Sequence, residues 1–273
     1  MQVKYNFPFD DYLATEALSA SQLKTFLRSP AHYKAGLETT RKDTPALRFG
    51  RLFHSYLLEP DTITLAVAPT VDRRTKDGKA AYAAFCAENT ASEVVTLDEA
   101  EALNGMSRTV WDHPAAAELL GSERETELSV FWDEPVDSEF TKSLSCKARI
   151  DALTQDGWVA DLKTAEDSSP AGFARACKRY GYAVQAAWYL HAARQTGIEP
   201  KGFVFVAVEK TSPWAVGVYQ ISKIDIEAAE DRIWSALPEL VRCQESGIYP
   251  AYSNEMMTLQ LSIGNGWDSG DIF

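Results

Sequence analysis

The sequence has few cysteines, no long apolar run and no excess of basic residues, and each absence excludes a class of protein. The four cysteines stand at least 31 residues apart, without the C-x-x-C pairs that usually supply metal or iron–sulfur sites: Cys86, Cys146, Cys177 and Cys243. No apolar stretch approaches the ~20 residues of a membrane span, and the opening MQVKYNFPFDDY lacks the features of a signal peptide. We therefore expect a cytoplasmic protein with free thiols and no iron–sulfur cluster.

Basic residues are outnumbered: 27 Lys and Arg stand against 39 Asp and Glu, which gives a formal net charge of −12. This balance excludes a protein that coats nucleic acid through a basic surface. The charge is unevenly spread, because residues 80–139 alone carry −12 and residues 211–273 carry −6, whereas residues 24–79 carry +5 and residues 140–210 carry +3. A phosphate-binding surface would be expected in the two net-positive stretches.

The 273 residues are 45% hydrophobic and 24% charged, which supplies enough apolar side chains for one large domain. Apolar spacing and turn residues predict helices at 18–37 (broken at Pro30) and 44–60, a strand at 127–132, a hairpin at 143–164, helices at 168–180 and 182–197, strands at 202–208 and 214–221, and a helix at about 225–245. This order predicts an α/β fold, with a mixed central β-sheet flanked by helices. We expect a single domain over residues 1–273, with an acidic helical insertion at about 80–125 and a loosely held tail at about 250–273.

The hairpin at 143–164 has two alternating arms, with polar side chains on one face and apolar side chains on the other. If residues 155–157 form a three-residue loop with Gly157 in the left-handed conformation, Asp151 lies directly across from Asp161. A loop of two or four residues would offset the two aspartates by one position. The register is therefore a prediction.

Two carboxylates that face each other in a half-buried setting repel, and a divalent cation relieves that repulsion. Asp151, Asp161 and the backbone carbonyl of Leu162 would suit a hard ion such as Mg²⁺ or Mn²⁺. Lys163 projects to the same face as Asp161 and could orient a water molecule or neutralise charge that develops on a phosphate. The alternative interpretation is an ordinary cross-strand charge cluster at the protein surface.

Other residues favour the functional interpretation. Glu127 begins a neighbouring predicted strand, His54 lies on an earlier helix, and Gln185 and Tyr189 stand four residues apart on the helix that follows the hairpin. Taken alone, His54 would be a core-facing histidine on an amphipathic helix, and Tyr189 would be a packing aromatic. Together with the hairpin residues they form a recognisable set.

The set Gly50…His54, Glu127, Asp151, Asp161-Leu162-Lys163 and Gln185-x-x-x-Tyr189 resembles the PD-(D/E)xK nuclease superfamily. The segment from CKARIDAL to YLHAA is similar to the nuclease domain of the RecE, or exonuclease VIII, family in the RecB-like branch, and the resemblance spans roughly residues 15 to 250. It implies a restriction-endonuclease-like core. Asp161 stands where many members of the superfamily have Glu, and the chain lacks the long N-terminal extension of some RecE proteins, so we expect a stand-alone nuclease domain.

The resemblance also implies an activity, which is Mg²⁺-dependent 5′→3′ exonuclease digestion of linear double-stranded DNA. Mn²⁺ could substitute for Mg²⁺, and the 3′ single strands would pass to a RecT-type annealing protein in homologous recombination. A homo-tetrameric ring and no contact with membranes are expected on the same basis. An endonuclease of the same superfamily and a DNA-binding or scaffolding module without catalysis remain alternatives.

The expected roles can be stated residue by residue. The metal set is Asp151, Asp161, the Leu162 carbonyl, His54 and Glu127, and the catalytic set adds Lys163, Gln185 and Tyr189 to those side chains. DNA would contact a basic, metal-loaded groove within an otherwise acidic exterior. The residues expected to line that groove are Arg48, Arg51, Arg73, Arg74, Lys147, Arg149, Lys178 and Arg179.

Overall fold

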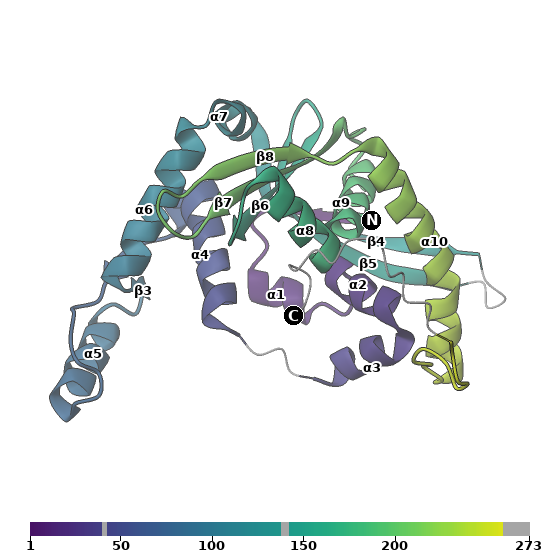
Figure 1. Ribbon diagram of the computed structural model, residues 1–273, viewed down its shortest axis with the longest axis horizontal. Helices are drawn as coiled ribbons and strands as arrows, with labels where there is room; N and C mark the ends of the chain where they lie inside the picture. Colours follow the sequence, from purple (N-terminus) through teal and green to yellow (C-terminus); the bar gives the residue numbers. More distant parts are fainter. Residues whose placement is uncertain (40–42, 138–141, 259–273) are drawn as a thin grey trace.

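A six-stranded mixed sheet lies at the centre of the protein, and helices cover both of its faces (Figure 1). The computed structural model describes residues 1–39, 43–137 and 142–258. The order across the sheet is β1-β4-β5-β6-β7-β8, and all neighbours are antiparallel except β6 and β7. The strands are β1 (Gln2–Lys4), β4 (Arg124–Val136), β5 (Lys142–Thr154), β6 (Trp158–Ala165), β7 (Gly202–Glu209) and β8 (Val216–Gln220). The predicted mixed α/β fold is confirmed.

Two hydrophobic cores form because successive strand residues point to opposite faces of the sheet. In β7, Phe203 and Phe205 join the first core and Val206 and Val208 join the second. The first core packs α2 (Ala20–Arg28), α3 (Pro30–Glu38), α8 (Pro170–Tyr180), α9 (Tyr182–Gln195) and α10 (Lys223–Ser246) against the sheet. The second packs α4 (Pro45–Leu58), α6 (Leu97–Asp112) and α7 (Pro114–Gly121). The central strands are therefore buried on both faces, as the parallel β6–β7 pair requires.

A small unit stands apart from this body. Strands β2 (Leu65–Val67) and β3 (Glu93–Val95) pair in parallel and are joined by α5 (Lys76–Glu88), which projects away from the sheet (Figure 1). In α5 only Gly78 is buried. Arg48 on α4 holds the unit in place, since its guanidinium donates to Glu99 on α6 and to the Val94 carbonyl on β3 at 2.9 and 2.7 Å.

The helix boundaries follow local signals in the sequence. Ser19 caps α2 in a capping box with Gln22, Ser29 and Pro30 open α3, and Thr44 caps α4. The short elements β1, α1 (Phe9–Ala14), β2 and β3 are absent from the prediction, because three to six residues give too little periodicity. The predicted loosely held tail lies partly outside the described residues, since 259–273 are not described. Within the described part of the chain, no helix has both the length and the apolarity needed to cross a lipid bilayer.

The predicted hairpin register is confirmed. Gly157 has φ of +94°, and its N–H donates to the Thr154 carbonyl at 3.0 Å, so the loop holds three residues. The paired residues are Leu153 with Val159 and Ala152 with Ala160. The next pair in this register is Asp151 with Asp161, and there the backbone ladder between β5 and β6 ends.

Candidate active site

The two aspartates lie where β5 and β6 separate. Instead of a backbone carbonyl, the Oδ2 atom of Asp151 accepts the Leu162 N–H at 2.8 Å. Farther along β5, Leu18 takes the position that β6 has left, with hydrogen bonds from Leu18 N to Ser145 O and from Lys147 N to Leu18 O. The separation opens a space at the sheet surface without leaving the edge of β5 unpaired.

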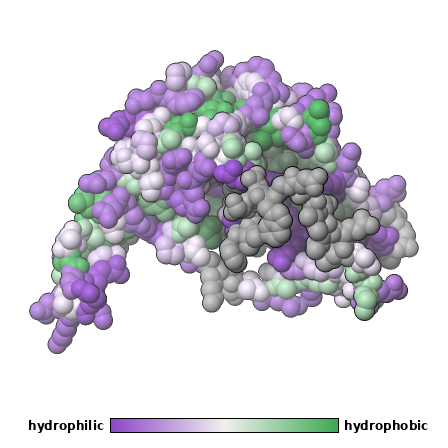
Figure 2. All heavy atoms as spheres, viewed as in Figure 1, coloured by the Kyte–Doolittle hydropathy of each residue, from purple (hydrophilic) through white to green (hydrophobic). Residues whose placement is uncertain are grey.

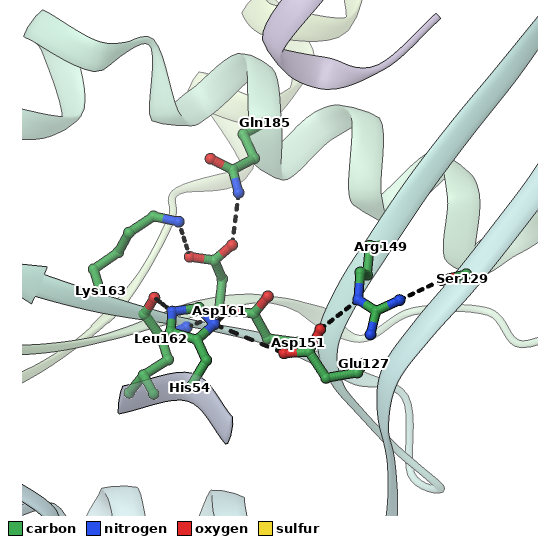
Figure 3. A network of polar contacts seen from close by, with 9 residues as sticks. All are labelled: His54, Glu127, Ser129, Arg149, Asp151, Asp161, Leu162, Lys163 and Gln185. Atoms are coloured by element: carbon green, nitrogen blue, oxygen red, sulfur yellow. Dashed lines mark hydrogen bonds and ion pairs between the residues drawn. The ribbon is translucent and has the colours of Figure 1, made fainter. Parts of the chain in front are cut away.

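Asp161 is held from both sides (Figure 3). Its Oδ1 accepts from the Gln185 amide on α9 at 2.6 Å, and its Oδ2 contacts the Lys163 ammonium. Asp161 is 1% exposed, and Oδ2 has no partner in hydrogen-bond geometry. Gln185, which the sequence placed in the catalytic set, thus contacts Asp161 directly.

His54, Glu127 and Asp151 form the second half of the site (Figure 3). His54 Nδ1 lies 3.3 Å from Asp151 Oδ2 and 3.8 Å from Glu127 Oε1, and Nε2 lies 2.8 Å from the Leu162 carbonyl. In the tautomer that carries its proton on Nε2, the histidine donates to Leu162 and directs its Nδ1 lone pair toward the carboxylates. The chain thus brings a residue of α4 to the aspartates of the hairpin.

The position of Glu127 depends on strained backbone. The β4–β5 register places Glu127 opposite Asp151, and its φ is +49°, a left-handed conformation that is uncommon for glutamate. Arg149 fixes the side chain by donating from Nε to Glu127 Oε2 at 2.5 Å. Such strain persists where surrounding contacts enforce it, and it is concentrated at functional sites.

Burial and neighbouring charges shift the pKa values of four residues of the site, namely His54, Glu127, Asp151 and Lys163. Burial alone would lower the pKa of His54, but the Asp151 and Glu127 carboxylates outweigh burial and raise it to about 9. Burial and the nearby Asp161 carboxylate raise the pKa of Asp151 well above its ordinary value. Burial would raise the pKa of Glu127, yet His54 and Arg149 hold it below the usual range. Likewise, Asp161 and Asp151 overcome the burial of Lys163 and raise its pKa.

The donor set fits a divalent cation. The ligand atoms of His54, Glu127 and Asp151 lie within 4.8 Å of one another. The Leu162 carbonyl retains a lone pair beside His54, and the buried Asp161 Oδ2 lacks a hydrogen bond. Carboxylate and carbonyl oxygens with one imidazole suit Mg²⁺ or Mn²⁺.

Two aromatic rings lie beside the Lys163 ammonium, and the sequence did not predict this contact. Its ammonium lies 5.1 Å from the centre of the Tyr182 ring and 5.7 Å from that of Phe205. Tyr182 is the first residue of α9, after the left-handed Gly181 that ends α8. No local pattern signals this contact, because it depends on how α9 packs on β6 and β7.

The cluster forms part of the wall of a cavity of about 1260 Å³. Residues of α1, α2, α3 and α4 form the other walls, and the lining includes Tyr189 of α9. The Tyr189 ring packs 6.3 Å from that of Phe203, and burial raises the pKa of its hydroxyl. Tyr189 thus has both a packing contact and a cavity face.

The expected DNA-binding cations divide into two groups. Arg48, Arg51, Lys147 and Arg149 line the cavity, whereas Arg73, Arg74, Lys178 and Arg179 do not, so the cavity is not the single basic groove that the sequence predicted. Contact of the latter four with DNA outside the cavity stays a prediction. Each cavity arginine already has a carboxylate partner: Glu99 for Arg48, Asp43 for Arg51 and Glu127 for Arg149.

Lys147 differs most from its expected role. It is 5% exposed, and its ammonium donates to the carbonyls of Tyr12, Leu13 and Thr15 at 2.8, 3.3 and 2.6 Å. Burial lowers its pKa. These three acceptors occupy the donors of the ammonium, so Lys147 anchors α1 rather than binding a phosphate.

Comparison with known proteins agrees with this geometry. The family model for a PDDEXK-like domain of unknown function, DUF3799, matches residues 19–261. The crystal structure of a candidate exonuclease from Eubacterium rectale superposes with a TM-score of 0.62, at 14% identity, over 96% of this chain and 97% of that one. An alkaline exonuclease from Laribacter hongkongensis gives a TM-score of 0.40 at 14% identity over 87% and 95% of the two chains, a similarity too low to support an argument. No curated protein matches the sequence.

Proposed function

The chain belongs to the DUF3799 family of PDDEXK-like domains, and on that premise we propose that it is a metal-dependent nuclease that degrades linear double-stranded DNA from its ends. One observation supports this most directly: His54, Glu127, Asp151, Asp161 and Lys163 converge on one wall of a large cavity. Carboxylates grouped with a lysine are suited to hydrolysing a phosphodiester with a divalent cation.

The protein's own residues prepare the site before any substrate arrives. Arg149 fixes the Glu127 carboxylate, Leu162 N–H fixes Asp151, and Gln185 fixes one oxygen of Asp161. A Mg²⁺ or Mn²⁺ ion held by His54, Glu127, Asp151, Asp161 and the Leu162 carbonyl would lower the pKa of a bound water and neutralise charge on the phosphate. The hydrogen bonds from Arg149, Leu162 and Gln185 orient the carboxylates in advance, so the site would need little reorganisation when it binds a cation.

Lys163 supplies the remaining positive charge. Its ammonium, which the neighbouring carboxylates keep protonated, can donate to the attacking water or to a non-bridging phosphate oxygen. Tyr189 faces the same cavity and could contact the sugar–phosphate chain. The hydrolysis breaks one P–O bond and forms one, with the water proton passing to the leaving oxygen or to solvent.

The cavity walls favour a strand end as substrate. Residues from four helices face the sheet across the cavity, and its volume is only somewhat above the ~300–1,000 Å³ of small-ligand pockets. Such a space suits a few nucleotides of one strand better than an uninterrupted duplex laid across the site. Resemblance to the RecE family supports the finer proposals of 5′→3′ polarity, transfer of 3′ strands to a RecT-type protein and assembly into a tetrameric ring.

Two substrates test the proposal: a linear duplex labelled at one 5′ or one 3′ end, and a covalently closed circular duplex assayed in parallel. With Mg²⁺ we expect loss of linear duplex from the 5′ end, an intact circle, and no reaction in EDTA. Lys163→Met and Asp161→Asn should each lower the rate by about 10²–10⁴-fold, whereas Lys34→Met on the exposed face of α3 should not. Wild-type rates in both variants would refute the site, and cleavage of the circle would indicate an endonuclease.

A further inference from the structure

The cavity has an apolar wall that hydrolysis itself does not require. Helix α1 presents Phe9 and Leu13, one turn apart, and both line the cavity with 38% and 48% of their surface exposed. Leu37 of α3 also lines it and is 48% exposed. Exposed large apolar side chains grouped in a concave site mark a binding surface.

Two cations on β5 hold this apolar face in place. Helix α1 has only six residues and would not be stable alone. The buried Lys147 ammonium binds the carbonyls at its C-terminal end, and Arg149 Nη1 donates to the Phe7 carbonyl just before it, at 2.7 Å. Both cations come from the row on β5 that also carries Asp151. The orientation of α1 is therefore tied to the strand that bears the catalytic carboxylate.

The apolar face lies close to the reacting centre. The guanidinium carbon of Arg149 is 5.8 Å from the centre of the Phe9 ring, and Arg149 Nε is 2.5 Å from Glu127. The guanidinium carbon of Arg51 also lies 5.8 Å from the centre of that ring. The Arg149 side chain thus contacts both the Phe9 ring and the Glu127 carboxylate.

We propose that Phe9 and Leu13 form a nucleobase subsite, on which the base next to the scissile phosphate stacks. This inference rests on the proposed function, because it takes the phosphate to lie at the carboxylates. A nucleotide has a charged phosphate and a base with flat, apolar faces. The cavity offers a partner to each part, with the carboxylate cluster for a metal-bound phosphate and the Phe9 ring beside it for the base. Stacking on aromatic side chains depends little on sequence, since every base has a π-face. The subsite therefore positions an unpaired terminal nucleotide without selecting its identity.

Steady-state kinetics with Phe9→Ala, Leu13→Ala and Phe9→Trp provide the first test. Stacking is worth about 1–3 kcal/mol per base, so Phe9→Ala should raise KM for linear DNA about 5- to 150-fold and leave kcat within about twofold. Leu13→Ala should also raise KM. Phe9→Trp keeps an aromatic ring and should therefore keep the wild-type KM. Ile224→Ala, which removes an apolar side chain that is 78% exposed on α10, is the matched control and should change neither constant. Phe9 is partly exposed, so these variants should keep the wild-type melting temperature.

Binding of DNA that carries 2-aminopurine at a strand end provides a readout independent of cleavage. With Ca²⁺ in place of Mg²⁺, the wild type should quench the fluorescence of the terminal 2-aminopurine, Phe9→Ala should not, and Phe9→Trp should. If the wild type digests DNA while Phe9→Ala and Leu13→Ala keep wild-type KM and quenching, the subsite is refuted and the nuclease function stands. If the wild type quenches the probe but never hydrolyses DNA, the subsite stands and the proposed activity is refuted.

Discussion

Three alternate residues of β5 show how strongly context decides the role of a side chain. Lys147, Arg149 and Asp151 project from the same face of one strand, as the period of two requires. Lys147 anchors α1, Arg149 links the segment that begins α1 to Glu127, and Asp151 joins the carboxylate cluster. A row of charges that resembles a solvated face in the sequence is thus a chain of contacts from the N-terminal helix to the carboxylate cluster.

Tyr182 should act as a positioning residue for Lys163. A cation–π contact contributes about 0.5–2 kcal/mol. Tyr182→Leu removes the ring that positions the Lys163 ammonium and should therefore lower kcat about 2- to 30-fold. Tyr182→Phe keeps the ring and should retain wild-type kcat.

Tyr252→Leu removes a tyrosine that is 71% exposed and serves as the control for this comparison. A purely structural role for Tyr182 would instead lower the melting temperature and leave kcat of the folded protein unchanged. Equal loss of kcat in Tyr182→Phe would show that the hydroxyl, not the ring, is what matters.

Glu134 should make stability depend on acid pH. Burial opposes its ionisation, but its pairs with His191 at 2.6 Å and Trp132 at 2.8 Å outweigh burial and lower its pKa. A depressed carboxylate pKa adds stability that is complete above the unfolded-state pKa of about 4.3 and is lost as the pH falls through the lower folded-state pKa. Glu134→Gln should therefore cost about 1 kcal/mol at pH 7, after allowance for partial exposure, and progressively less below about pH 4.

Urea unfolding of wild type and Glu134→Gln at pH 7 and pH 3 measures this difference. The indole fluorescence is a suitable signal, because the rings of Trp132, Trp188 and Trp234 lie within 6.4 Å of His191. Glu199→Gln, at a side chain that is 83% exposed, should show no such change. If Glu134→Gln lowers the free energy of unfolding by the same amount at both pH values, the ionised Glu134 carboxylate is not the source of the stabilisation.

At the scale of elements, the site exists because two strands stop pairing. The β5–β6 ladder ends at the aspartates, and the side chain of Asp151 and the segment at Leu18 satisfy the freed backbone groups. Helix α4 then enters from the opposite side and brings His54 to the Leu162 carbonyl. Without this divergence the two aspartates would face each other with no room for a cation.

Helix α6 and the β7–β8 connection should be coupled through Gly105. A Cβ atom at Gly105 would lie 2.5 Å from ring atoms of Trp214, and Thr109 on the same helix donates to the Trp214 carbonyl at 2.9 Å. Gly105→Ala gains helix propensity worth up to about 1 kcal/mol but must displace the indole, so we expect net destabilisation of about 1–3 kcal/mol. Thermal unfolding measures the change.

The control for this prediction is Gly121→Ala. Nothing lies within 4 Å of a Cβ placed at Gly121, at the end of α7, so that variant should match or exceed wild-type stability. If Gly105→Ala is stabilising as well, the indole can move freely and the proposed coupling between α6 and the connection is wrong.

At the scale of the whole molecule, the net charge of −12 is consistent with a cavity whose cations are already paired. Among the described residues that line the cavity, Arg48, Arg51, Arg149 and Lys163 each pair with a carboxylate, and Lys147 binds carbonyls. The face seen in Figure 2 is mostly hydrophilic, with hydrophobic side chains in several small areas. Because the cavity cations already have partners, the cavity wall provides no strong sequence-independent attraction for DNA.

Binding of DNA should therefore depend weakly on salt and strongly on metal. Each phosphate neutralised adds about 0.9 to the slope of log K against log of salt concentration. Because the cations of the described cavity wall already have partners, binding within the cavity alone predicts a slope of magnitude below about 3. Affinity in EDTA should fall sharply because the carboxylate cluster then repels phosphate. Fluorescence anisotropy with a labelled duplex from 50 to 300 mM KCl, with Ca²⁺ or EDTA, measures both effects, and a slope above about 6 would show a basic surface outside the cavity.

Local patterns in the sequence determined the layered fold and the hairpin register, and the resemblance to a nuclease family pointed to the residues of the carboxylate cluster. Alternation defines strand faces, caps define helix starts, and a three-residue loop ending in glycine sets Asp151 against Asp161. Only the tertiary structure decided what each cation binds and which face of α1 borders the site. The position of α1 depends on contacts between residues more than 100 positions apart, Lys147 with Tyr12 and Arg149 with Phe7, which no local periodicity records.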